Sequence, residues 1–211
     1  MFITKILRRK TRGRTYLIYI DGARAFELSD DVLAEFGLRV GDEITEKAVE
    51  QIVTSEARSR AQRIGINYLS YRPRSSKEVV QHLVRKGFSE DLARRTADHL
   101  HKLQLLDDTK FARIFVRDRL SRKPVGRAFL RRALQEKGIA PNVVEQVLRD
   151  HISEEDQEKA AEEIASRRLR LAKASFDKLA PERRRKRLLE YLLRRGFSNE
   201  IAHRTVRTIL S

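Results

Sequence analysis

One short pattern recurs three times along the chain, and it limits the fold more than any other feature of the sequence. Each copy has apolar residues eight and four positions before a glycine, a basic residue directly before it, and a proline 14 or 15 positions before it. Apolar residues four positions apart lie on one face of a helix, and a glycine in a left-handed conformation commonly ends a helix. The pattern therefore predicts helices that end at Gly87, Gly138 and Gly196, each glycine with a positive φ angle.

Two further helices complete each copy of the pattern. Ser89 and Ser198 suit the N-cap of a helix that follows the glycine, and Pro141 suits the first turn of the corresponding helix. Another helix is expected before each proline, because a stripe of apolar residues precedes it in all three copies. The clearest stripe consists of Phe111, Ala112, Phe115, Val116 and Leu120.

The three glycines are 51 and 58 residues apart, so each copy is a three-helix repeat of about fifty residues. A unit of this size buries its apolar face poorly alone, and we expect neighbouring repeats to stack and complete the core. The predicted fold class is therefore mainly α, with three tandem three-helix repeats in an elongated, curved body. The expected repeats are residues 57–106, 107–152 and 153–211.

Residues 1–56 have a different pattern and are expected to form a small β-rich element. Runs rich in β-branched and aromatic residues are separated here by turn signals such as Asp-Gly. Ser29 and the two aspartates after it are expected to cap a short helix that Gly37 ends. We expect a β-hairpin or a three-stranded sheet, with helical structure from about Thr54 onward. The expected strands are residues 3–7, 15–20 and 25–28.

The net charge of +16 arises entirely after residue 56. Residues 1–56 carry nine Lys and Arg against ten Asp and Glu, whereas residues 57–211 carry 37 against 20. Basic residues near phosphates release counterions, so this one-sided excess favours a polyanionic partner over a role in solubility alone. The absence of cysteine excludes disulfides, and no apolar run approaches the length of a membrane span. We expect a cytoplasmic protein that binds no membrane.

The placement of basic residues repeats with the helices, which makes them candidates for DNA or filament binding. They flank the three prolines and precede the glycines. Stacking of the repeats would align the proline corners in one stripe, and this stripe could meet DNA phosphates or an acidic protein surface. The candidates are Arg72, Arg74, Arg85, Lys86, Arg122, Lys123, Arg127, Arg131, Arg132, Arg183, Arg184, Arg185, Lys186, Arg187, Arg194 and Arg195.

No set of residues in the sequence fits a catalytic or metal site. A phosphate-binding loop of the form Gly-x-x-x-x-Gly-Lys-Ser/Thr is absent. His99 and His101 would point in different directions on a helix, so we expect surface residues rather than metal ligands. Asp107 and Asp108 could form a paired-carboxylate site, but an N-cap for the helix of Phe111 is the stronger interpretation. We therefore expect no enzyme activity, no cofactor and no metal.

Four segments of the chain resemble the RecX family, the regulators of the RecA recombinase. The resemblance is dense over residues 57–152 and looser over residues 153–211. An Arg-Pro-Arg-Ser segment and a Leu-Leu-Asp-Asp-x-x-Phe-Ala segment, at the separation found here, are fairly specific together. The matching segments are residues 69–75, 83–88, 105–112 and 126–139.

The resemblance implies tandem three-helix repeats in a crescent that binds along the groove of the RecA–DNA filament. It also implies inhibition of recombinase and ATPase activity by a monomeric, non-catalytic protein, with a role in homologous recombination, DNA repair and the SOS response. Residues 1–56 depart from the shorter members, so no role is implied for them. The alternative hypothesis is a nonspecific DNA-binding repeat protein without a recombinase partner, which would bind bare and filament-coated DNA equally.

Overall fold

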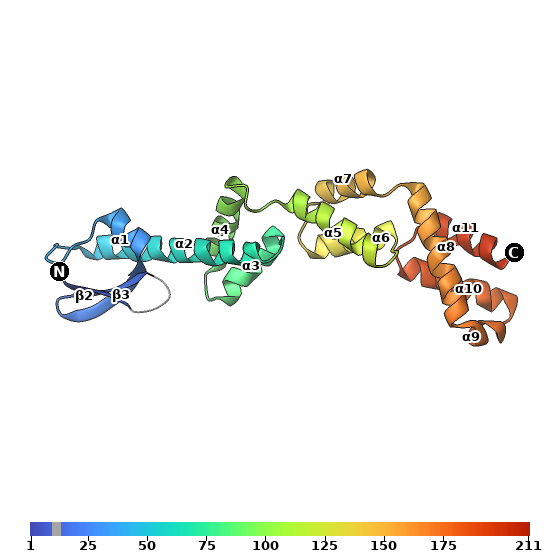
Figure 1. The fold of residues 1–211 in the computed structure, drawn as a ribbon, viewed down its shortest axis with the longest axis horizontal. Helices are drawn as coiled ribbons and strands as arrows, with labels where there is room; N and C mark the ends of the chain where they lie inside the picture. Colours follow the sequence, from blue (N-terminus) through green and yellow to red (C-terminus); the bar gives the residue numbers. More distant parts are fainter. Residues whose placement is uncertain (10–13) are drawn as a thin grey trace. The chain divides into compact units, whose positions relative to one another are not determined.

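The computed structural model describes residues 1–9 and 14–211, which form a small sheet followed by helices (Figure 1). This arrangement confirms the predicted mainly α fold with an N-terminal β element. In chain order the elements are β1 Ile3–Arg8, β2 Thr15–Ile20, β3 Ala23–Ser29, α1 Asp30–Phe36, α2 Glu46–Ser70, α3 Ser76–Arg85, α4 Glu90–Lys102, α5 Asp108–Arg122, α6 Arg127–Glu136, α7 Pro141–His151, α8 Glu154–Leu171, α9 Lys173–Asp177, α10 Pro181–Arg194 and α11 Asn199–Leu210.

The strands form an antiparallel sheet in the order β1-β2-β3, which confirms the three-stranded form of the prediction. Ile18 in the middle strand pairs with Ile6 of β1 and with Phe26 of β3. Alternate residues of a strand face the same side, so one face of the sheet can be apolar. Ile3, Ile18 and Leu28 are buried in a core that α1 and the start of α2 complete (Figure 1).

The short helix α1 has the predicted bounds, but Ser29 does not cap it as expected. Ser29 occupies the N-cap position without a side-chain bond to the helix, and Gly37 ends the helix with a φ of 60°. The hydroxyl and the N–H of Ser29 both donate to one carboxylate oxygen of Glu56, at 2.7 and 2.8 Å. A hydrogen bond to a charged acceptor is stronger than one to a main-chain group, so Ser29 connects β3 to α2 instead.

The helix α2 begins at Glu46, well before the expected start of the helical region at Thr54. The hydroxyl of Thr45 accepts a hydrogen bond from the first turn and caps it. Ile52 belongs to the core of the sheet, whereas Ala61 belongs to the core of the first three-helix group. The boundary expected after residue 56 falls inside this helix, and the division of the chain at that point remains a prediction.

Each predicted repeat forms a three-helix group with its own core. The groups are α2–α4, α5–α7, and α8 with α10 and α11. The unpredicted short helix α9 adds the buried ring of Phe176 to the third core. Eleven and ten buried residues already close the second and third cores, so the expectation of a core shared between stacked repeats is wrong for these two groups.

The helix ends follow the predicted pattern. Gly87, Gly138 and Gly196 have φ angles of 90°, 80° and 85°, which confirms the left-handed conformation at all three. The side chains of Ser89 and Ser198 accept hydrogen bonds from the first turns of α4 and α11, as expected of N-caps.

The chain forms two compact units. The first contains residues 1–72 and 79–106, and the second contains residues 73–78 and 107–211. The second unit therefore includes both the second and the third three-helix groups, and the contacts between these two groups described below lie within it.

Candidate nucleic-acid interface

The proline corner of the second group lies directly on the glycine end of the third group. Gly126 donates its N–H to the carbonyl of Arg195 at 2.9 Å, and Ala128 donates its N–H to the carbonyl of Gly196 at 3.0 Å. A Cβ added to Gly126 would lie 1.9 Å from the carbonyl carbon of Gly196. The φ of Gly126 is −76°, so glycine is needed here for the close approach of two main chains and not for its conformation.

A second contact of the same kind occurs within this unit, at the glycine end of the second group. Ser75 donates its hydroxyl to the carbonyl of Lys137 at 2.7 Å, and Lys77 donates its ammonium to the carbonyl of Glu136 at 3.0 Å. In both cases a segment that follows a proline supplies donors to the last carbonyls of a helix, which lack partners inside that helix. In both contacts, the segment after a proline therefore meets the helix end that carries the glycine of the next repeat along the chain.

This arrangement sets the proline corners of the second and third groups apart, and their alignment in one stripe remains a prediction. The corner at Pro124 lies at the C-terminal end of α10, whereas Pro181 begins that helix. The 14 residues of α10 span about 20 Å at 1.5 Å per residue. The corners of the second and third groups are thus separated by the length of a helix.

Three of the candidate arginines hold their own groups together. Arg127 donates to the carbonyls of Leu148 and Ile152, at 3.3 and 2.7 Å, and so satisfies the C-terminal end of α7. Arg184 donates to the carbonyl of Phe176 at 3.2 Å. These guanidiniums are half-buried and engaged, which makes them supports of the fold rather than ligands for an external anion.

The third, Arg131, joins α6 to α7 through Glu145. Its guanidinium donates to the two carboxylate oxygens at 2.5 and 2.9 Å, in the bidentate geometry that gives strong pairing. The hydrogen bonds from Arg131 lower the pKa of the Glu145 carboxyl, and the same contact raises the pKa of Arg131. The contact therefore favours the ionised form of both side chains.

The other candidates lie nearer the surface. Arg74 and Arg195 are half-buried, and Arg72 is exposed. Four exposed arginines have local contacts: Arg85 with the carbonyl of Gln81, Arg122 with Asp118, Arg194 with Glu190, and Arg187 with Ser175. Exposed contacts of this kind contribute little to stability, so these arginines can exchange their present partner for a phosphate. Six candidates are exposed and have no side-chain hydrogen bond or ion pair among the described residues: Lys86, Lys123, Arg132, Arg183, Arg185 and Lys186.

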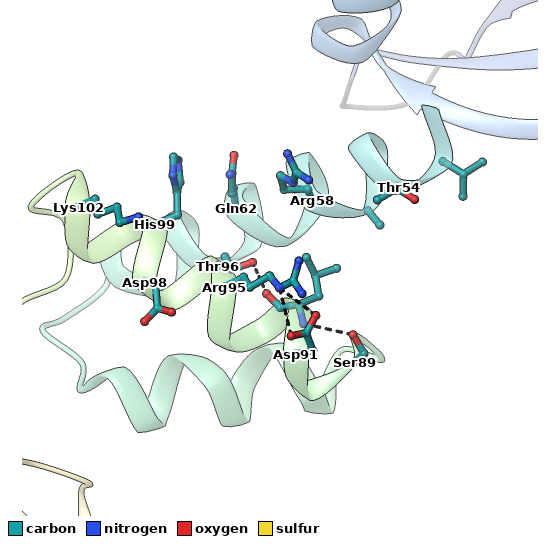
Figure 2. Close-up of a pocket in the computed structure, with 13 residues that line it drawn as sticks. Thr54, Arg58, Gln62, Ser89, Asp91, Arg95, Thr96, Asp98, His99 and Lys102 are labelled. Atoms are coloured by element: carbon teal, nitrogen blue, oxygen red, sulfur yellow. Dashed lines mark hydrogen bonds and ion pairs between the residues drawn. The ribbon is translucent and has the colours of Figure 1, made fainter. Parts of the chain in front are cut away.

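The first unit contains a groove of about 620 Å³ between α2 and α4, which the sequence did not predict. Figure 2 shows Arg58 and Gln62 from α2 pointing to the same side as His99 from α4. Asp91 also lines the groove and pairs with Arg95 at 3.0 Å. Because its lining carries both signs of charge, this groove is a weaker candidate for an anion than the basic surfaces.

Sequence reasoning missed two basic residues of the second unit. Arg167 and Arg168, near the C-terminal end of α8, line the same cavity as the candidates Lys123 and Arg195. The run Arg-Arg-x-Arg was visible in the sequence, but its helix face could not be compared with a corner that lies more than forty residues away. The buried Gln157 was missed for the same reason, and it links α8 to the second group.

The predicted cap at Asp107 and the predicted surface positions of two histidines are confirmed. The side chain of Asp107 accepts from the N–H of Lys110 at 2.9 Å, so it caps α5 as expected. His99 and His101 are both exposed. Over residues 1–9 and 14–211, no group of three or more metal-ligating side chains is assembled. In the same part of the chain, none of the helices combines the length and the apolar character that crossing a membrane requires.

Three family models match the chain, and together they cover more than half of it. They describe the first, second and third three-helix domains of RecX and match residues 61–100, 107–148 and 154–206. Each match lies inside one of the three expected repeats.

Related proteins give the same result. The regulatory protein RecX of Lactobacillus delbrueckii subsp. bulgaricus is 34% identical over 200 residues, which is 95% of this chain and 72% of the relative. The regulatory protein RecX of Lactobacillus johnsonii is 33% identical over 204 residues, which is 97% and 73% of the two chains. A crystal structure of regulatory protein RecX aligns with this chain over 98% of each of the two chains, with a TM-score of 0.78 and 28% sequence identity.

Proposed function

Because the chain belongs to the RecX family of regulatory proteins, we propose that it regulates a RecA-type recombinase by binding the filament that this recombinase forms on DNA. Binding inhibits strand exchange and ATP hydrolysis by the filament. The protein acts as a monomer in the cytoplasm, uses no cofactor and catalyses no reaction itself.

The observation that carries this proposal is the set of exposed cations without intramolecular partners. Arg183, Arg185 and Lys186 lie together on the first turns of α10, and Lys123 and Arg132 belong to the second group. A cation that meets a phosphate releases a condensed counterion, so contact with the DNA of the filament favours binding at low salt.

The test compares strand exchange and ATP hydrolysis by a RecA recombinase with and without this protein. A variant with Arg183→Gln, Arg185→Gln and Lys186→Gln removes three charges from α10 and should bind the filament more weakly, with a flatter salt dependence. Arg184 and Arg187 are left unchanged. Arg184 donates to the carbonyl of Phe176 and Arg187 lies over its ring, so both are kept in order to preserve the fold around Phe176.

A matched control removes three exposed cations that are each paired with a carboxylate four positions earlier. These are Arg94, Arg95 and Lys159, also changed to glutamine. The control should inhibit the recombinase like the parent.

Binding to bare DNA separates the two surfaces that the α10 residues could meet. Weaker binding of the α10 variant to both ligands indicates DNA phosphate, and weaker binding to the filament alone indicates an acidic protein surface. A parent protein that leaves strand exchange and ATP hydrolysis unchanged would refute the proposal. Equal binding of such a parent to bare and coated DNA would favour a nonspecific DNA-binding protein instead.

A further inference from the structure

The second unit has a basic cavity of about 210 Å³ where its two groups meet. Its lining includes Lys123 after α5, Arg167 and Arg168 of α8, and Arg195 after α10. Among the described residues, no carboxylate lines it. Four positive charges therefore converge on one small space from three separate parts of the chain.

The aromatic ring of Tyr191 orders two of these cations. The guanidinium carbon of Arg168 lies 5.3 Å from the ring centroid, and that of Arg195 lies 5.7 Å from it. Contact with an aromatic face holds a guanidinium by its plane, which leaves the N–H groups along its edge available as donors. The two arginines are thus fixed in position before any ligand arrives.

None of the four cations uses its side chain in a hydrogen bond or ion pair within residues 1–9 and 14–211. Many exposed arginines of this chain are paired with a carboxylate four positions earlier, as Arg94 is with Glu90. The cavity is therefore lined by cations that no carboxylate of the described residues neutralises, and like charges around one small space repel each other. An anionic ligand would relieve this repulsion and accept the unused N–H donors.

We propose that this cavity binds the phosphate groups of a nucleic-acid backbone and that Arg167 and Arg168 are ligands of the phosphates. A nucleic-acid strand carries one negative charge about every 3.4 Å, which suits several cations in a small space. Guanidiniums donate two parallel N–H groups to a phosphate. A single carboxylate of a protein partner would neutralise only one of the four charges. The inference rests on the part of the proposed function that concerns DNA contact, but not on inhibition of the recombinase.

The experiment measures binding of a fluorescent dT oligonucleotide by anisotropy across a series of NaCl concentrations. The variant carries Arg167→Gln and Arg168→Gln, and the control carries Arg94→Gln and Arg95→Gln, which is also an adjacent arginine pair on a helix. Each phosphate contact on a single strand contributes about −0.7 to the log–log salt slope. The double variant should therefore flatten the slope by about 1.4 and weaken binding about 25-fold at about 0.1 M salt. The control should keep the slope of the parent.

Circular dichroism shows whether the double variant folds. If the loss of Arg168 from the ring of Tyr191 prevents folding, Arg167→Gln alone is used, because Arg167 is exposed and its side chain makes no hydrogen bond or ion pair within residues 1–9 and 14–211. It should weaken binding about fivefold at about 0.1 M salt.

Three results would overturn the inference. The folded variant could bind the oligonucleotide with the affinity and slope of the parent, or the parent could fail to bind it at all. The variant could also bind the oligonucleotide normally but lose affinity for a recombinase filament, which would assign the cavity to an acidic protein surface. In each case the parent can still inhibit strand exchange, so failure of the inference is distinguishable from failure of the proposed function.

Discussion

Replacing Gly126 by alanine tests whether main-chain contact holds the second and third groups together. Alanine adopts a φ of −76° without strain, so conformation alone predicts a stabilisation of about 0.4–1 kcal/mol. The added Cβ would, however, lie 1.9 Å from the carbonyl carbon of Gly196, and main-chain atoms cannot move aside as the end of a flexible side chain can. The two main chains must separate, and the hydrogen bonds to the carbonyls of Arg195 and Gly196 are lost.

The expected magnitude follows from these contacts. Two hydrogen bonds contribute about 1 kcal/mol each, and overpacking adds about 1–3 kcal/mol. After the conformational gain is subtracted, Gly126→Ala should lower the free energy of unfolding by about 2–4.5 kcal/mol. The control is Gly87→Ala, where φ is 90° but the space around an added Cβ is open. That substitution should lower the free energy of unfolding by about 1 kcal/mol, because only the left-handed conformation is strained.

Urea denaturation followed by circular dichroism measures both effects. Hydrogen exchange adds a local measurement, because the amide of Ala128 should exchange faster in the Gly126→Ala variant when its partner carbonyl moves away. The reasoning is refuted if Gly126→Ala lowers stability no more than Gly87→Ala does.

Two further substitutions test contacts of the second unit. Arg131 lowers the pKa of the Glu145 carboxyl in the folded state. The pair therefore stabilises the fold fully above the unfolded-state pKa of about 4.3. This stabilisation is lost as the pH falls through the folded-state pKa of Glu145. Glu145→Gln should therefore lose less stability than the parent on acidification in thermal melts, and an unchanged pH dependence would contradict this. Gln157 is buried and accepts from the N–H of Arg127 at 2.7 Å, so Gln157→Leu leaves a half-buried main-chain donor without its partner. Gln157→Leu should lower the free energy of unfolding by about 1–3 kcal/mol in urea titrations. The control Gln146→Leu, on the exposed side of α7, should change that free energy little. Equal effects of the two substitutions would argue against a role of Gln157 in holding the N–H of Arg127.

The local structure of the chain could be predicted from its sequence because the signals are short-range. A helix end at Gly196 and an N-cap at Ser198 depend on residues within one or two turns, and the structure confirms both. The three-stranded sheet and the apolar stripes follow equally from periodicity. The start of α2 was missed because the cap at Thr45, which lies just after a turn, was not recognised.

The candidate site was predictable only as a list of residue types. Basic residues repeat with the prolines and glycines, but the sequence alone does not say which of them the fold uses internally. Arg127 is one of the basic residues that flank Pro124, yet its guanidinium binds carbonyls at the C-terminal end of α7. Arg184 belongs to an unbroken basic run, yet α9 folds back and occupies its guanidinium.

The sequence by itself determined the helices, their ends and the threefold repetition, because each depends on neighbours a few positions away. Tertiary structure decided which repeat ends meet, because a corner can dock only where two main chains approach without a Cβ between them, as at Gly126 and Gly196. That contact also brings Lys123 to Arg195, which is far away in the chain, and both to the arginines of α8. Whether a cation is neutralised or available depends on such distant neighbours, since electrostatic interaction is set by distance in space and not by separation in sequence.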